Sequence, residues 1–239
     1  YYDARSGCDA ANTERVFPFT GGSRFIQNGV LSQRATGIFG YSLLAAVIPA
    51  GLWLTVVSAS GLIGIGMLGL LVGWAYSAPP LKLQSRGLGE FGITAAWLLV
   101  VVGADFVQRR HFAPLPFAAG LGFALLVANV LYVNQFPDIR ADALAGKRTL
   151  VVRLGTSRAR WGYGVIAGLA HLWLPLSVAT GLLPAKSLAG MVSLLPAAIA
   201  LRTLWPHAHQ PSRLEPAIKL TILAAIVHGL ALAAALAVA

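Results

Sequence analysis

Long apolar segments alternate with short polar ones along almost the whole chain. Seven segments stay apolar over roughly the 20 residues that a membrane-spanning helix needs. We expect these spans at Gly37–Val57, Gly61–Tyr76, Phe91–Val107, Pro114–Val133, Trp161–Gly181, Ser187–Trp205 and Ile218–Val238. The second span is short and rich in glycine, a composition that lets helix backbones approach closely in lipid. The pattern predicts an all-α, multispanning membrane bundle with seven transmembrane helices, in one domain over residues 1–239.

Composition agrees with this pattern. Of the 239 residues 57% are hydrophobic and only 11% are charged, against about 25% charged residues in soluble domains. The single cysteine excludes a disulfide scaffold, and the apolar content excludes a disordered chain. The net charge of +10 would also suit nucleic acid. Because the basic residues lie between apolar segments, we expect the anionic face of a lipid bilayer as partner, and no nucleic acid.

Basic residues are concentrated in alternate loops. If residues 1–36 are cytoplasmic, all of the 18 Lys and Arg except Arg109, Arg110 and Lys186 fall on the cytoplasmic side. The positive-inside rule therefore orients the chain.

Four of the eight carboxylates form two groups. Asp3 and Asp9 lie near the start of the chain, and Asp138 and Asp142 follow the fourth predicted span. We expect both groups in cytoplasmic loops. Like charges repel, and a divalent cation between them would remove that cost. Mg²⁺ prefers oxygen ligands and usually binds one or two carboxylates together with phosphates. The two groups would then hold a diphosphate through Mg²⁺.

The second acidic group has a regular spacing. Asn134, Asp138 and Asp142 lie four residues apart, so they would share one face of a helix. Pro137 argues for a break or for a first-turn position there, so the face need not be continuous. A simpler alternative remains, in which both aspartates pair with Arg140 and other basic residues in a solvated loop.

Basic residues follow both acidic groups. Arg24 comes after Gly21-Gly22-Ser23, and Lys147 and Arg148 come after Gly146. Lys and Arg beside glycine-rich backbone suit phosphate oxygens. Each segment alone would be an ordinary turn, so it is the repetition beside both acidic groups that favours a phosphate site.

Together these segments resemble the UbiA superfamily of intramembrane aromatic prenyltransferases. The resemblance rests on Asp3…Asp9 with Gly-Gly-Ser-Arg24, on Tyr76-Ser-Ala-Pro-Pro-Leu-Lys82, and on Asn134-x-x-x-Asp138-x-x-x-Asp142 with Gly146-Lys-Arg-Thr149. It covers residues 1 to about 160 by motif and the rest by hydropathy. The long spacing from Asp3 to Asp9 is most similar to the 1,4-dihydroxy-2-naphthoate polyprenyltransferases of menaquinone synthesis.

The resemblance also implies a missing segment. The family has nine transmembrane helices, so two would precede Tyr1, and we expect the chain to be N-terminally incomplete. The Asn that opens the family's first acidic motif would lie just before Tyr1. The motif's second Asp often comes four residues after the first, where this chain has Gly7.

The resemblance further implies a function and a set of site residues. A polyprenyl group would pass from an isoprenyl diphosphate to an aromatic acceptor at the cytoplasmic face of a bacterial inner membrane. Metal ligands for Mg²⁺ would be Asp3, Asp9, Asp138 and Asp142, of which Asp3, Asp138 and Asp142 are the catalytic set. The diphosphate would be bound by Arg24, Lys82, Lys147 and Arg148. The substrate cavity would be lined by Tyr76, Tyr132 and Asn134.

Other functions remain open at this stage. Within the family, the acceptor would instead be 4-hydroxybenzoate, homogentisate, a porphyrin or a glyceryl phosphate. A transporter would carry acids in the middle of its spans, and here none is found, although Lys219 and His228 lie in the last span. A CDP-alcohol phosphotransferase would carry its acidic residues in one compact stretch, whereas here they lie in two distant ones.

Overall fold

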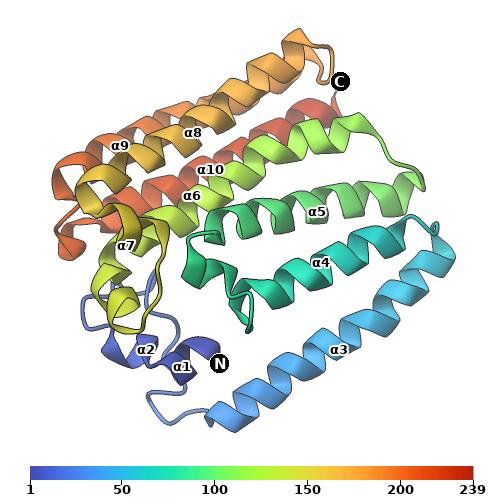
Figure 1. Ribbon diagram of the computed structural model, residues 1–239. Helices are drawn as coiled ribbons and strands as arrows, with labels where there is room; N and C mark the ends of the chain where they lie inside the picture. Colours follow the sequence, from blue (N-terminus) through green and yellow to red (C-terminus); the bar gives the residue numbers. More distant parts are fainter. Residues whose placement is uncertain (239) are drawn as a thin grey trace.

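The computed structural model describes residues 1–238, and over these residues it consists of helices and connecting turns (Figure 1). The elements are α1 (Tyr2–Ser6), α2 (Cys8–Ala11), α3 (Gln33–Val57), α4 (Leu62–Ser77), the 3₁₀ turn η1 (Leu83–Arg86), α5 (Gly89–Arg109), α6 (Pro114–Leu144), α7 (Leu150–Leu154), α8 (Thr156–Ala179), η2 (Ala185–Ser193), α9 (Leu194–His207), η3 (Pro211–Arg213) and α10 (Glu215–Ala237).

The predicted all-α membrane bundle is confirmed. Among the described residues, six helical segments are long and apolar enough to cross a membrane: α3, α5, α6, α8, α10 and the continuous stretch Ala185–His207. The expected span Gly61–Tyr76 corresponds to α4, which is apolar but only 16 residues long. The number of seven spans therefore stays a prediction.

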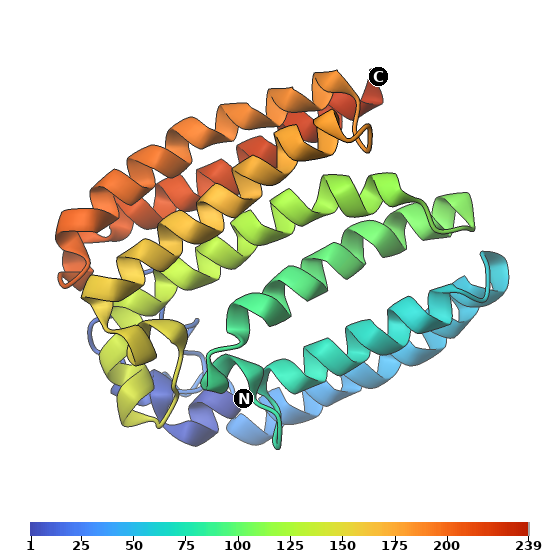
Figure 2. The ribbon, with the colours of Figure 1, turned by 45° about the horizontal axis from the view of Figure 1, so that its top comes forward.

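Helix α6 is the centre of the bundle. It packs against α5 on one side and against α8 and α10 on the other. Figures 1 and 2 show α3 and α4 beyond α5, at the edge of the molecule farthest from α9. Helix α3 buries only Gly37 along its 25 residues, so its apolar side chains are exposed, as expected for a helix in lipid.

The core between α6 and α8 depends on close backbone approach. Tyr132 of α6 is buried and its hydroxyl donates to the backbone oxygen of Ala159, at 2.7 Å. Tyr163 of α8 shares a 2.9 Å hydrogen bond with the hydroxyl of Thr221 in α10. A Cβ atom on Gly162 would lie 2.2 Å from the Tyr132 hydroxyl oxygen. Only glycine therefore fits where α8 crosses Tyr132.

The structure corrects the expected loops around the acidic residues. Helix α6 continues to Leu144, through Pro137, so Asp138 and Asp142 lie on a helix and not in a loop. A proline in a helix interior removes one backbone donor, which the surrounding packing in membrane proteins tolerates, and Pro137 is fully surrounded by protein. The segment before Asn12 is likewise helical, as the short helices α1 and α2.

The short elements gather at one end of the bundle. Helix α2 and helix α7 both contact α6, and η1 contacts α4 and α5. Figure 1 shows α1, α2 and α7 together at the end of the bundle opposite the C-terminus. Both acidic groups therefore lie at the same end.

Candidate active site

The second acidic group is carried by a rigid element. Asp138 and Asp142 are four residues apart on α6, so both face the same side of the helix. The side chain of Asp142 is 8% exposed. Buried carboxylates need partners, because a buried charge that has lost its partner destabilises a protein by about 3–5 kcal/mol. The contacts of these two residues therefore define the site.

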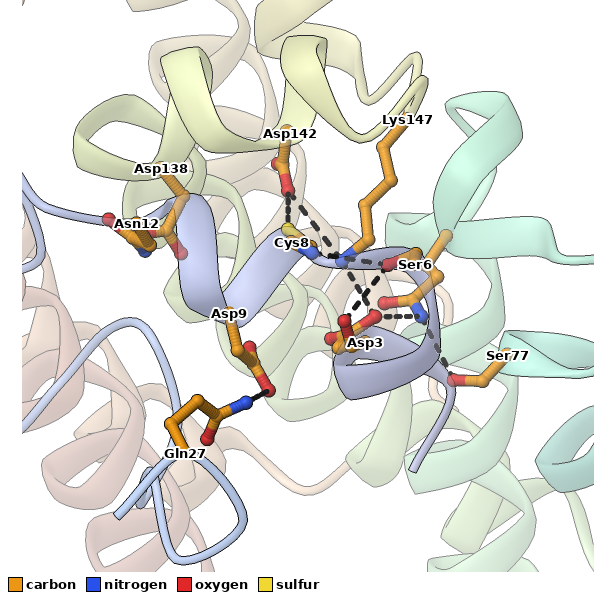
Figure 3. A network of polar contacts seen from close by, with 11 residues as sticks. Asp3, Ser6, Cys8, Asp9, Asn12, Gln27, Ser77, Asp138, Asp142 and Lys147 are labelled. Atoms are coloured by element: carbon orange, nitrogen blue, oxygen red, sulfur yellow. Dashed lines mark hydrogen bonds and ion pairs between the residues drawn. The ribbon is translucent and has the colours of Figure 1, made fainter. Parts of the chain in front are cut away.

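Lys147 joins the two acidic groups. Its Nζ atom lies 2.8 Å from Oδ1 of Asp3 in α1 and 3.6 Å from Oδ1 of Asp142. Figure 3 shows the lysine extending from the turn after α6 to a point between the two carboxylates. The side chains of Lys147 and Asp142 are 10% and 8% exposed, whereas that of Asp3 is 38% exposed. The lysine is thus a buried counter-ion shared by the two groups.

Each of the four carboxylates also accepts a hydrogen bond from a neutral side chain. Three of the pairs are Cys8 Sγ to Asp142 at 3.2 Å, Asn12 Nδ2 to Asp138 at 2.7 Å and Gln27 Nε2 to Asp9 at 3.4 Å (Figure 3). The fourth is Gln84 Nε2 to Asp3 at 3.4 Å. The sequence analysis missed these four donors. Cys8 and Asn12 lie in the first acidic segment, and this proximity is the only signal that would have marked them.

Burial and charge set the protonation of the groups around the lysine. Burial raises the pKa of the Cys8 thiol to about 12, so the thiol is a neutral donor at neutral pH. Burial, and then the negative charge of Asp3, raise the pKa of Asp9. Burial alone would lower the pKa of Lys147, but the carboxylates of Asp3 and Asp142 outweigh it and raise the pKa. Lys147 is therefore charged.

The carboxylates line a cavity of about 470 Å³. Asp3, Asp9, Asp138, Asp142 and Lys147 form its wall, together with the predicted phosphate ligand Arg24 and the glycine-rich turn before it. An adjacent cavity of about 310 Å³ shares Tyr2, Asp3, Ser77 and Lys147 with the first and is also lined by Lys82, Gln84 and Gly146.

Two of the predicted phosphate ligands have an unusual backbone. Arg24 and Lys82 adopt φ angles of 58° and 44°. Residues other than glycine rarely occupy this left-handed region, and those that do concentrate at functional sites. The Arg24 guanidinium also donates to the backbone oxygen of Asn12, at 3.1 Å. This bond ties the glycine-rich turn to the segment that carries the first acidic group.

Four predicted site residues lie apart from these cavities. Arg148 is exposed, lines neither cavity, and donates its backbone N–H to the oxygen of Ser85. Tyr132 is in the core against Ala159. The ring of Tyr76 lies against Gly92 of α5, where a Cβ atom would be 3.1 Å away. The Oδ1 atom of Asn134 is buried without a hydrogen-bond partner in the described part of the chain.

The donor set suits a hard cation. Carboxylate oxygens are the ligands that Mg²⁺ prefers, and four of them face one cavity. Among residues 1–238, no three Asp, Glu, His or Cys side chains lie close enough to hold a metal ion by themselves. Mg²⁺ usually binds one or two carboxylates and completes its shell with water and phosphate oxygens. The residues therefore fit Mg²⁺ that is shared with a diphosphate, with Asp3, Asp9, Asp138 and Asp142 as the available ligands.

Comparisons with known proteins identify the family of the chain. The pattern of the UbiA prenyltransferase family matches residues 1–226. The 1,4-dihydroxy-2-naphthoate octaprenyltransferase of Mycobacterium tuberculosis is 30% identical over 98% of this chain and 78% of its own length. Proteins of the same name from Mycobacterium leprae and Haemophilus influenzae are 29% and 28% identical, over 80% and 76% of this chain. The chain spans 64% and 60% of the length of these two relatives. No solved structure matches the chain.

The fold, the paired acidic segments and the family pattern all lead to one assignment. The match covers both acidic segments and ends at Ile226, about midway along α10. The resemblance found in the sequence is thereby confirmed. The chain is an integral membrane protein that belongs to the UbiA prenyltransferase family, whose enzymes transfer prenyl groups.

Proposed function

We propose that the protein transfers a polyprenyl group from an isoprenyl diphosphate to 1,4-dihydroxy-2-naphthoate in a Mg²⁺-dependent reaction. The observation that carries the proposal is the convergence of Asp3, Asp9, Asp138 and Asp142 with Lys147 around one cavity. The acidic residues come from segments far apart in sequence, so the fold brings them together. The acceptor follows the names of the relatives from Mycobacterium and Haemophilus.

The cationic side chains would bind the diphosphate. Lys147 and Arg24 line the larger cavity and Lys82 lines the smaller one. Because the two cavities share Lys147, a diphosphate between them would meet positive charge on both sides. When bound, Mg²⁺ would add positive charge at the leaving diphosphate, where preorganised cations lower the barrier most.

The chemical step balances without a further reactant. The C–O bond of the donor breaks, and its electron pair leaves with the diphosphate. The ring carbon that bears the carboxylate forms the new C–C bond to the allylic carbon. Loss of CO₂ then returns the bonding pair to the ring. Membrane helices would exclude water from the allylic cation, which water would otherwise quench.

The membrane would orient the bundle and hold the apolar tail of the donor. The acidic end of the bundle carries the loops that are rich in Lys and Arg, and the positive-inside rule supports a cytoplasmic position for it. The apolar tail of the donor would lie among the helices or in the bilayer. In a bacterial cell, this is the inner membrane.

A turnover assay tests the proposal. Membranes that carry the protein receive a labelled allylic polyprenyl diphosphate and dihydroxynaphthoate, 4-hydroxybenzoate or no acceptor, with Mg²⁺ or with EDTA. We expect a prenylated naphthoquinol and CO₂, only with dihydroxynaphthoate and only with Mg²⁺. Product with hydroxybenzoate alone would overturn the acceptor. If folded protein gives no product with any acceptor, the proposed prenyl transfer is wrong and the transporter alternative is favoured.

A further inference from the structure

Two loops that carry basic residues both line the smaller cavity. The first loop runs from Pro79 to Gly87 and presents Lys82, and the second runs from Ala145 to Thr149 and presents Lys147. They come from different parts of the chain, so contacts between the loops set the spacing of the two lysines.

Arg153 of α7 connects the two loops on their outer side. Its Nε atom donates to the backbone oxygen of Arg148 at 2.9 Å, and its Nη2 atom donates to the backbone oxygen of Arg86 at 3.0 Å. The backbone N–H of Arg148 completes the connection by donating to the oxygen of Ser85, at 2.9 Å. The guanidinium thus holds one carbonyl of each loop in a single planar fork.

Gly87 makes room for this arginine. It has a φ angle of 73°, and a Cβ atom there would lie 2.9 Å from Arg153 Nε and 3.2 Å from the Arg148 oxygen. The first loop therefore ends in a residue without a side chain at the point where the guanidinium crosses it. Arg153 itself lines neither cavity and is exposed.

A second connection joins the same loops on the inner side. Gln135 of α6 donates to Glu90, just after the first loop, at 2.5 Å. Its Oε1 atom accepts from the backbone N–H of Val151, just after the second loop, at 3.3 Å. The C-terminal ends of the two loops are thus connected twice, by Arg153 on the exposed side and by Gln135 on the buried side.

We propose that Arg153 is a positioning residue that sets the distance between Lys82 and Lys147, and hence the affinity for the diphosphate of the donor. The proposal rests on the proposed function. Arg153 acts through backbone carbonyls and not by contact with the substrate. Its loss should therefore weaken donor binding and leave acceptor binding unchanged.

The test compares Arg153→Gln with Arg158→Gln. Arg158 lies near the start of α8, is exposed, and has no side-chain hydrogen bond or ion pair within residues 1–238, so it controls for the loss of one positive charge. The readouts are the Kd of Mg²⁺-pyrophosphate for the purified protein and the KM values of donor and acceptor. We expect the Kd and the donor KM to rise about tenfold in Arg153→Gln, within the range for supporting residues of a site. The acceptor KM should stay unchanged, and Arg158→Gln should match the parent protein.

Two further variants separate geometry from charge and from folding. Arg153→Lys keeps the charge without the planar fork, so it should resemble Arg153→Gln. Gly87→Ala moves the arginine from the other loop and should raise the donor KM even where Arg153→Gln fails to fold. Parent-like behaviour of Arg153→Lys, or equal effects in Arg153→Gln and Arg158→Gln, would overturn the positioning role alone. A parent protein that binds no pyrophosphate would overturn the proposed function as well.

Discussion

The two acidic segments reach the same cavity on very different supports. Asp138 and Asp142 lie on α6, a helix of 31 residues that is buried among α5, α8 and α10. Asp3 and Asp9 lie on helices of five and four residues, joined at Gly7 with a φ angle of 78°. Helices this short have little stability of their own. The first segment therefore depends on side-chain contacts for its position, and the second does not.

This difference assigns distinct roles to the two walls. The wall from α6 is fixed by the packing of the bundle. The wall from α1 and α2 is held by Lys147 on Asp3, by Cys8 on Asp142 and by Asn12 on Asp138. Each of these contacts joins the weaker wall to α6 or to the turn after it. The following predictions test this division, from the largest expected effect to the smallest.

Loss of a carboxylate on the fixed wall should have the largest effect. Asp138→Asn and Asp142→Asn should each reduce kcat/KM by about 10³-fold, comparable to the loss of one preorganised electrostatic contact in an active site. Near-isosteric amides keep the shape of the helix surface, so the unfolding temperature of Asp138→Asn should stay close to that of the parent. Asp142→Asn removes one of the two carboxylates that pair with Lys147, so its unfolding temperature should be lower. Steady-state kinetics and a thermal melt of purified protein measure both. Turnover near the parent level in either variant would remove that residue from the catalytic set.

Loss of the shared lysine should weaken both the donor site and the fold. In Lys147→Met, Asp3 and Asp142 would face each other without a counter-ion. Breaking a buried pair costs about 3 kcal/mol or more, and the partial exposure of Asp3 reduces its share. We expect a donor KM about 100-fold higher, in line with one lost charge contact, and a lower unfolding free energy.

Added Mg²⁺ sharpens this prediction. It should stabilise Lys147→Met more than the parent, because the two carboxylates then lack their internal cation. Thermal melts with and without Mg²⁺ provide the comparison, and Lys147→Arg, which keeps the charge, is the control. An equal Mg²⁺ effect in Lys147→Met and the parent would contradict the role of Lys147 as counter-ion.

On the wall from α1 and α2, substitution of Asp9 should reduce activity less than substitution of Asp3. Asp3 binds Lys147 and Gln84, whereas within residues 1–238 Asp9 accepts only a long side-chain hydrogen bond, from Gln27. Asp3→Asn should reduce kcat/KM by about 100-fold and Asp9→Asn by about tenfold, the range for groups that support a metal site. The same assay with varied Mg²⁺ measures both, and a larger loss in Asp9→Asn would reverse the order of the two residues.

The neutral donor to Asp142 should have the smallest effect. Cys8→Ala removes one hydrogen bond to a charged group, worth about 1.5–3 kcal/mol at most. The weak thiol donor and the remaining contact with Lys147 reduce this value, so we expect a loss of about threefold in kcat/KM. Cys8→Ser keeps a donor and should behave as the parent. Equal losses in the two variants would show that Cys8 acts through its size.

Much of the fold was predictable, since all seven apolar segments are helical in the structure. The end of α6 was not, because the sequence cannot show that neighbouring helices surround Pro137 and tolerate it. Tyr132 lies two positions before Asn134 and six before Asp138, which turns it about 120° from Asp138 on a helix. This rotation directs it to Ala159 in the core. It was predictable once α6 was known to be continuous.

The donor set of the carboxylates was not predictable. Gln84 reaches Asp3 across 81 positions of sequence, and Asn12 reaches Asp138 across 126. Such contacts depend on how the helices pack, which no local pattern records. In contrast, Arg24 and Lys147 were identified from their glycine-rich surroundings and Lys82 through the family resemblance, and all three line the two cavities.

The length of α6 has a consequence for where the reaction occurs in the bilayer. At 1.5 Å per residue its 31 residues extend about 46 Å, well beyond the ~30 Å of hydrocarbon. Gln135 bonds to Glu90 in the first turn of α5, so Asp138 and Asp142 stand beyond the level where α5 begins. With α5 spanning the hydrocarbon, the carboxylates would lie at headgroup depth. Under the proposed function, a lipid-like donor would place its diphosphate there while its tail stays dissolved in the membrane, so that supply of donor and release of product would both proceed by diffusion in two dimensions.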